Sequence, residues 1–241
     1  MQKKHLYPSL IINSLIVLLE TYVLTNAYYG YVPGANGKGG QGVMMFRFFT
    51  EDSNLVLGFS CLLYVIFSLI SLKTKRSYRG IGLFKMIATA AVTTTFLVVL
   101  FFLAPATAIL YKTSYFMMFS WPNMLFTHFL CPVLAVVSFL FFEEPLESVH
   151  NDWQNACFAL ATVVPYAIIV GTLASLHLIS SDETINNVYG FMDATANWWA
   201  TSLAVVIILT GTYFEGFFLA KLQRKIHSKA VSSAPATPTA Q

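Results

Sequence analysis

Charged residues are scarce in this sequence of 241 residues: Asp, Glu, Lys and Arg make up 10% of it, against 56% for hydrophobic residues. A soluble domain needs a charged surface, and average usage is about 25% charged. The scarcity excludes a soluble globular fold and indicates an integral membrane protein in contact with the lipid bilayer. The net charge of +3 is small and follows the membrane topology, so no nucleic-acid partner is expected.

Cysteine is also rare. The three cysteines, Cys61, Cys131 and Cys157, all fall inside apolar stretches, where a thiol packs as a small hydrophobic group. They do not form a disulfide framework, and no His and Cys residues have the spacing of a zinc site. We therefore expect neither a metal nor another cofactor.

What the chain has instead is long apolar blocks. Six of them are long enough to cross a hydrocarbon core about 30 Å thick as helices. The fold predicted is all-α, a polytopic membrane protein with six transmembrane helices in one domain over residues 1–225 and a disordered tail over 226–241. The expected spans are 7–28, 53–72, 84–110, 119–142, 153–179 and 196–220.

The basic residues predict the orientation. When the segments are assigned alternately to the two sides, one side receives eleven of the fourteen Lys and Arg residues and the other receives three, Lys38, Arg47 and Lys112. Positive residues concentrate on the cytoplasmic side, so both termini are expected to be cytoplasmic. Lys85 is assigned to the basic cytoplasmic loop before the third span, and the acidic stretch 142–152 to another inner loop.

A histidine, His128, lies near the middle of the fourth span. An ionisable side chain at membrane depth must face protein or trapped water, so it is a functional candidate; the alternative is a neutral imidazole that only packs between helices. Pro132, four residues later, removes the usual donor to the His128 carbonyl and predicts a local widening. The other polar groups gather in the outer half, and the inner half has one ionisable residue, Glu215. The outer set is Glu20, Thr50, Asp52, His128, His177 and Asp193.

The polar residues of the outer set are not all expected at the same depth in the membrane. At about 1.5 Å per residue, Glu20 and His128 lie level, roughly 20 Å above the inner ends of their spans. Thr50 comes out about 12 Å above the histidine on a straight helix.

Three stretches, FRFFTEDSNLV, LFTHFLCPVLAVVSFLFFE and VYGFMD, resemble the androgen-induced and androgen-dependent family of six-span membrane hydrolases and its bacterial relatives. The resemblance covers most of residues 44–220 and implies hydrolysis of fatty acid esters, a lipid substrate and the plasma membrane of a bacterium. By motif, the family's threonine nucleophile and histidine correspond to Thr50 and His128. Gly190 stands where the family usually has proline.

The chemistry of this pair is that of acyl transfer. A threonine hydroxyl becomes a nucleophile when a base takes its proton, and an imidazole is the usual base. Supporting candidates are Glu20 and Asp52 to orient the imidazole, Asn54 and Asn123 to donate to the oxyanion, and Tyr189 and Asp193 from the third matched stretch. We expect Glu20 and His128 to share one polar cavity, with Thr50 and Asn54 at its mouth and apolar walls for an acyl chain.

Two other functions fit the same residues. In a small proton-coupled transporter, Glu20, His128 and Glu215 would form a relay across the bilayer, but the sequence has no convincing internal repeat and few polar groups in the inner half. In a non-catalytic structural protein, the polar groups would only hold helices together.

Overall fold

The computed structural model describes residues 3–30, 41–74, 78–110, 112–146, 151–176, 178 and 194–232. Within these ranges the chain is helical and has no strand. Six helical stretches are long and apolar enough to cross a membrane, which confirms the predicted all-α, six-span fold. The elements are α1 Lys3–Tyr29, η1 Gly42–Arg47, α2 Phe49–Thr74, α3 Arg79–Val98, η2 Val99–Leu103, α4 Ala104–Leu110, η3 Tyr115–Phe119, α5 Pro122–Leu125, η4 Phe126–Leu130, α6 Cys131–Phe141, α7 Asp152–Ser175 and α9 Ala194–Ser232.

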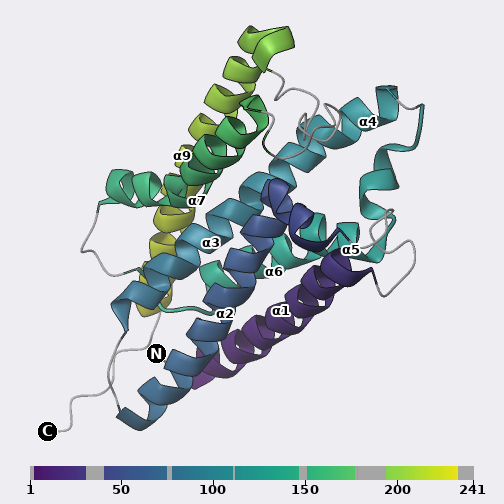
Figure 1. Cartoon of the computed structure of the whole chain (residues 1–241). Coiled ribbons are helices and arrows are strands. Elements are labelled where there is room, and N and C mark those ends of the chain that lie inside the picture. Colours follow the sequence, from purple (N-terminus) through teal and green to yellow (C-terminus); the bar gives the residue numbers. More distant parts are fainter. Residues whose placement is uncertain are drawn as a thin grey trace, which may run out of the picture.

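The third span is the centre of the bundle. Helix α3 contacts α2, α6, α7 and α9, while α1 packs on α2 and α6, and α7 pairs with α9 (Figure 1). Several of its inward positions are small residues, including Ala88, Ala90 and Ala91, which are fully buried. Small side chains let helices approach closely in a membrane, where no hydrophobic effect drives helices together.

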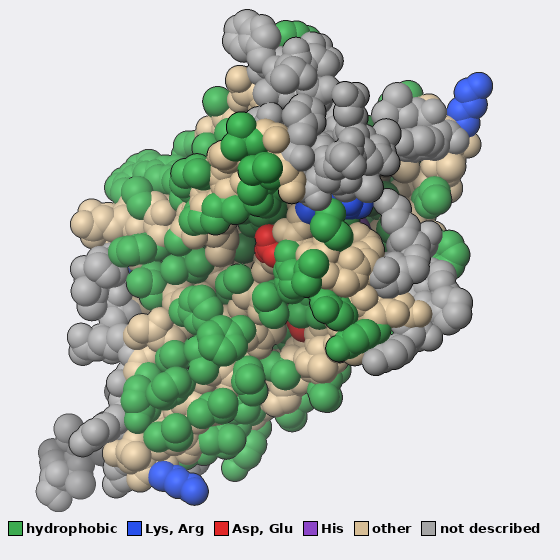
Figure 2. Space-filling view, in the orientation of Figure 1, with side chains coloured by type: hydrophobic (Ala, Val, Ile, Leu, Met, Phe, Trp, Pro, Cys, Tyr) green, Lys and Arg blue, Asp and Glu red, His purple; other side chains and the backbone are tan. Residues whose placement is uncertain are grey.

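The described surface is apolar. Figure 2 shows hydrophobic side chains over most of the face it presents, with few charged ones among them. Large side chains such as Ile11, Phe101, Ile168 and Ile207 are more than half exposed. Such a surface is unfavourable in water and suits the hydrocarbon of a bilayer.

Two boundaries differ from those expected from hydropathy. Helix α2 begins at Phe49 rather than at residue 53, so the polar segment Thr50–Asn54 forms its first turns. Helix α9 continues to Ser232, so residues 226–232, which we assigned to a disordered tail, are helical. The remainder of the tail, 233–241, lies outside the described residues.

The third and fourth spans each contain a π turn two residues before a proline. Segment η2 precedes Pro105, and segment η4 precedes Pro132. In both, the residue after the turn donates its N–H to the carbonyl five residues back: Ala104 to Val99, and Cys131 to Phe126. The expected widening near His128 is therefore present, as this π turn.

If the same bonding, from an N–H to the carbonyl five residues earlier, continued to each proline, one carbonyl would lack its donor, because proline has no N–H. The carbonyl five residues before Pro105 is that of Leu100, and the Tyr115 hydroxyl donates to it. The carbonyl five residues before Pro132 is that of Thr127, and Asn54 Nδ2 donates to it at 3.4 Å. Side chains from elsewhere in the bundle thus satisfy the backbone that the prolines release, as the membrane interior requires.

Helices α7 and α9 approach closely at Gly216. A Cβ at this position would lie 2.5 Å from Ala159 Cβ and 3.2 Å from Ala156 Cα. Only glycine allows this approach without a shift of the two helices.

Gly216→Ala is expected to destabilise the protein by about 1–3 kcal/mol, because the two helices must separate to admit the methyl group. Gly211→Ala, on an exposed face of the same helix with nothing within 4 Å of the added Cβ, is the matched control. It should be neutral or stabilising by up to about 1 kcal/mol. Thermal unfolding in detergent, followed by tryptophan fluorescence, should show a lower midpoint for Gly216→Ala and an unchanged or higher midpoint for Gly211→Ala; equal midpoints would contradict the close contact.

Candidate functional site

Thr50 lies in the first turn of α2, buried at one end of a cavity. The cavity has a volume of about 80 Å³ and lies between α2, α3 with η2, α7 and α9. Its walls are mainly aliphatic and aromatic; they comprise Phe49, Thr50, Thr94, Thr95, Val98, Val99, Leu103, Val163, Tyr166, Ala167, Val205, Ile208 and Leu209. Tyr166 closes one side, since its ring packs on Phe49 and its hydroxyl donates to the Arg47 carbonyl at 2.6 Å.

His128 is buried in the π turn η4 and held by one hydrogen bond. Its Nδ1 lies 3.3 Å from the carbonyl oxygen of Met118 in η3. A carbonyl only accepts, so Nδ1 carries the proton and the neutral ring has its lone pair on Nε2. No other described residue is hydrogen-bonded to Nε2, which leaves this nitrogen able to accept a proton.

Asn54 joins the threonine to the histidine segment. Its Nδ2 donates to the Thr50 carbonyl at 2.7 Å and to the Thr127 carbonyl at 3.4 Å. The two carbonyl oxygens therefore lie no further apart than the sum of these distances, and Thr127 precedes His128. The 12 Å difference in depth expected for straight helices is therefore not found between these two segments.

The expected shared cavity differs from the one observed. In the part of the chain that the structure describes, no hydrogen bond joins the Thr50 hydroxyl to His128, and neither His128 nor Glu20 lines the cavity at Thr50. Asn54 is fully buried between helices rather than at a cavity mouth. Thr50 thus faces an apolar space on one side of α2, and its backbone meets the histidine segment on the other.

Two other candidates, Asn123 and Asp52, lie in the same spans as His128 and Thr50. Asn123 accepts from Asn26 at 3.2 Å and donates to the Val23 carbonyl at 3.4 Å, which ties α5 to α1. Asp52 lies half-buried in the first turn of α2, where a carboxylate is favoured by the helix dipole. Neither is hydrogen-bonded to His128. Tyr189 and Asp193, with His177, lie outside the described residues.

Glu20 is buried in the middle of α1 and is 1% exposed. Neither of its carboxylate oxygens has a hydrogen-bond partner among the described residues. Its stem packs on the backbone of α2, where a Cβ on Gly58 would lie 3.1 Å from Glu20 Cβ, and its head lies against the Cys131 thiol. Burying an unpaired carboxylate at such a position costs several kcal/mol of folding free energy. The Glu20 carboxyl group must therefore carry a proton or bind a further polar group.

A second polar cluster, which sequence reasoning missed, lies in the half of the bundle near the two termini. Lys85 and Glu143 form an ion pair at 3.6 Å with side chains 0% and 1% exposed. Glu143 Oε1 also accepts from Asn13 Nδ2 at 3.1 Å and from the Ser138 hydroxyl at 2.8 Å. Lys85 was assigned to a loop and Glu143 to the next one, so the statement that Glu215 is the only ionisable residue of this half is wrong.

Glu215 itself lies half-buried on α9 and pairs with a threonine. The Thr94 hydroxyl donates to Glu215 Oε2 at 2.8 Å and lies 2.9 Å from the Thr212 hydroxyl. Thr94 also lines the cavity, so this group forms the polar edge of the apolar space. A cluster of three or more metal-ligating His, Cys, Asp or Glu side chains is absent from the described ranges.

Comparisons with known proteins found no match: no family model fits the chain, and neither a curated protein nor a solved structure is similar to it.

Proposed function

We propose that this protein is a membrane-embedded hydrolase of lipid esters, with Thr50 as nucleophile and His128 as general base. The observation that supports it most is the double hydrogen bond of Asn54, which brings the Thr50 and Thr127 carbonyls together beside an apolar cavity. A fatty acyl ester from the surrounding bilayer is the substrate class that suits such walls. The plasma membrane of a bacterium is the proposed location.

In this reaction the Thr50 hydroxyl oxygen attacks the ester carbonyl while His128 Nε2 takes its proton. The tetrahedral intermediate collapses, the ester C–O bond breaks, and the imidazolium returns the proton to the leaving alcohol. Water, with the same base, then hydrolyses the acyl-threonine and releases the fatty acid. The Met118 carbonyl keeps the proton on Nδ1 and thereby keeps Nε2 basic.

The approach of Thr50 to His128 depends on substrate. Catalytic hydrogen bonds are often long or misaligned before substrate binds and tighten in the complex. An acyl chain in the cavity would fix the ester next to the first turn of α2, and the π turn is a place where a helix adjusts easily.

Turnover of a panel of lipid esters by purified protein in nanodiscs tests the proposal. Wild type should hydrolyse at least one ester, and Thr50→Ala should lose turnover by roughly 10³-fold or more. Thr93→Val is the matched control, because the Thr93 hydroxyl donates only to the Thr89 carbonyl of its own helix, at 2.7 Å, and does not line the cavity. Equal turnover in wild type and Thr50→Ala would refute the assignment.

A further inference from the structure

The buried face of α1 carries polar side chains along its length, among the apolar Leu6, Ile16, Val23 and Ala27. Its inward positions recur every three or four residues, as expected of one face of a helix. Among them Ser9, Asn13, Glu20 and Asn26 are each at most 2% exposed. His5 precedes Ser9 by one turn on the same face, and from His5 to Asn26 the helix rises about 30 Å, the thickness of a hydrocarbon core. We call these five residues and their polar partners the α1 file.

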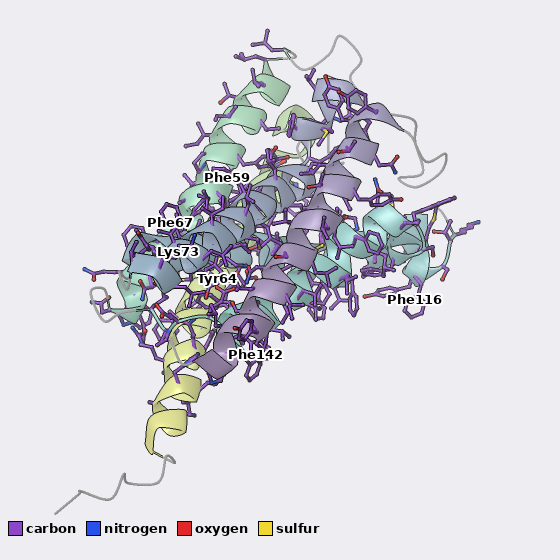
Figure 3. All side chains as sticks on the ribbon, turned by 90° about the horizontal axis from the view of Figure 1, so that it is seen from below. Phe59, Tyr64, Phe67, Lys73, Phe116 and Phe142 are labelled. Atoms are coloured by element: carbon purple, nitrogen blue, oxygen red, sulfur yellow. The ribbon has the colours of Figure 1, made fainter. Side chains whose placement is uncertain are left out.

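At the end near the termini, the file continues into side chains of other helices. The His5 ring lies 6.4 Å from that of His227 in α9 and 6.5 Å from that of Phe142, which Figure 3 places beside the first turns of α1. Ser9 lies at the Tyr64 hydroxyl of α2. Asn13 then meets the Lys85–Glu143 pair.

In the other half the file has fewer partners. Glu20 faces the Cys131 thiol of α6, with Cys61 and Glu51 of α2 as the further ionisable groups around it. Asn26 is hydrogen-bonded to Asn123 of α5 at 3.2 Å. The titratable groups facing Glu143 are Lys85 from α3 and Cys61 and Tyr64 from α2.

Some buried polar atoms of the α1 file have no hydrogen-bond partner among the described residues, and their chemistry indicates which small molecule would bind between them. Asn13 Oδ1, Glu143 Oε2, Lys85 Nζ and both Glu20 oxygens are buried without a hydrogen-bond partner among the described residues. Asn13 and Glu143 offer acceptors and Lys85 offers donors, so the missing partner must both donate and accept. A metal cation would satisfy the oxygens but not the ammonium group, whereas water satisfies both.

We propose that the α1 file, filled with internal water, conducts protons across the bundle between Glu20 and the Lys85–Glu143 pair. A proton taken from water at one face passes between water, carboxyl and amine groups and is returned to water at the other. Nothing is consumed, and the electrochemical gradient drives the transfer. The path differs from the relay through Glu20, His128 and Glu215 suggested by the sequence, because Glu215 pairs with Thr94 on the other side of α3.

Two buried apolar side chains of α1 interrupt the file: Ile16 between Asn13 and Glu20, and Val23 between Glu20 and Asn26. Ile16 is fully buried and packs with Leu57, Cys61 and Cys131. Internal water must pass Ile16, so this side chain sets the rate of transfer between Glu20 and the Lys85–Glu143 pair. Replacing it with a small hydroxyl residue should let water through.

The test is proton flux into vesicles of phosphatidylcholine and phosphatidylglycerol that contain the purified protein and a trapped pH-sensitive dye. A potassium gradient with valinomycin supplies the driving potential, and no ester is present. Wild type is expected to acidify the lumen faster than protein-free vesicles, Glu20→Gln to lose at least 10-fold of that excess rate, and Ile16→Ser to raise it several-fold. Glu215 lies outside the α1 file, so Glu215→Gln should leave the rate of proton flux unchanged.

Flux equal to that of empty vesicles for both wild type and Ile16→Ser would overturn the proposal, as would full flux in a monodisperse Glu20→Gln protein. The result is independent of ester hydrolysis. A protein that hydrolyses esters without proton flux would leave the Thr50 assignment intact and refute only the conducting file.

Discussion

Lys85→Met is expected to destabilise the protein by about 3–5 kcal/mol, although it removes a charge from the membrane interior. The reason is Glu143, which the mutation leaves as a buried carboxylate with its hydrogen bonds to Asn13 and Ser138 but without its counter-ion. The cluster joins α1, α3 and α6, so the loss should loosen the bundle at the terminal end. Equilibrium unfolding in mixed micelles would measure it.

The double variant Lys85→Met with Glu143→Gln should recover most of this loss. The glutamine carbonyl still accepts from Asn13 and Ser138, and no charge remains to be buried. The double variant could instead lose as much stability as Lys85→Met and Glu143→Gln added together. The two side chains would then not be energetically coupled, and the ion pair would not stabilise the fold.

Substitution of Thr50 and His128 should show the largest effect on activity. Thr50→Ala and His128→Ala are each expected to lower ester turnover by roughly 10³-fold or more, and the double variant should be little worse than either. Residues that act in one step fail together, because removing the nucleophile leaves the base nothing to activate. Single-turnover kinetics in nanodiscs would separate this effect from weaker binding.

Strictly additive losses would contradict the shared step. Thr50→Ser offers a further control, because serine keeps the hydroxyl and should retain measurable activity. Labelling by a fluorophosphonate probe should follow the same order: present in wild type and Thr50→Ser, absent in Thr50→Ala.

The number and position of the spans could be predicted because hydropathy responds to about twenty residues at once, and local detail averages out. The ends of the helices could not be predicted from hydropathy. Residues 49–52 look like an interfacial entry to a span, yet they form the first turn of α2, because Asp52 and Glu51 are favourable at a helix start.

The Lys85–Glu143 pair could not be found by the same means. A lysine next to a basic loop is the usual sign of the cytoplasmic side, and the rule that counts it has no information on whether the side chain turns inward. The signal available was Asn13, a lone amide in an otherwise apolar stretch, which requires a polar partner at the same depth. The proximity of Thr50 to the His128 segment was expected from the matched motifs, but the straight-helix estimate of depth argued against it, since hydropathy does not determine the tilt of a helix.

The π turns before Pro105 and Pro132 also set the rotational phase of the helices that follow them. A π turn accommodates one residue more than the regular helix of the same length, and one residue corresponds to about 100° around the helix axis. Side chains beyond each turn therefore face about a quarter-turn or more away from where an unbroken 3.6-residue period would put them. A protein that shared this fold but lacked one of the π turns would align with it only through a one-residue gap within Val99–Leu103 or Phe126–Leu130.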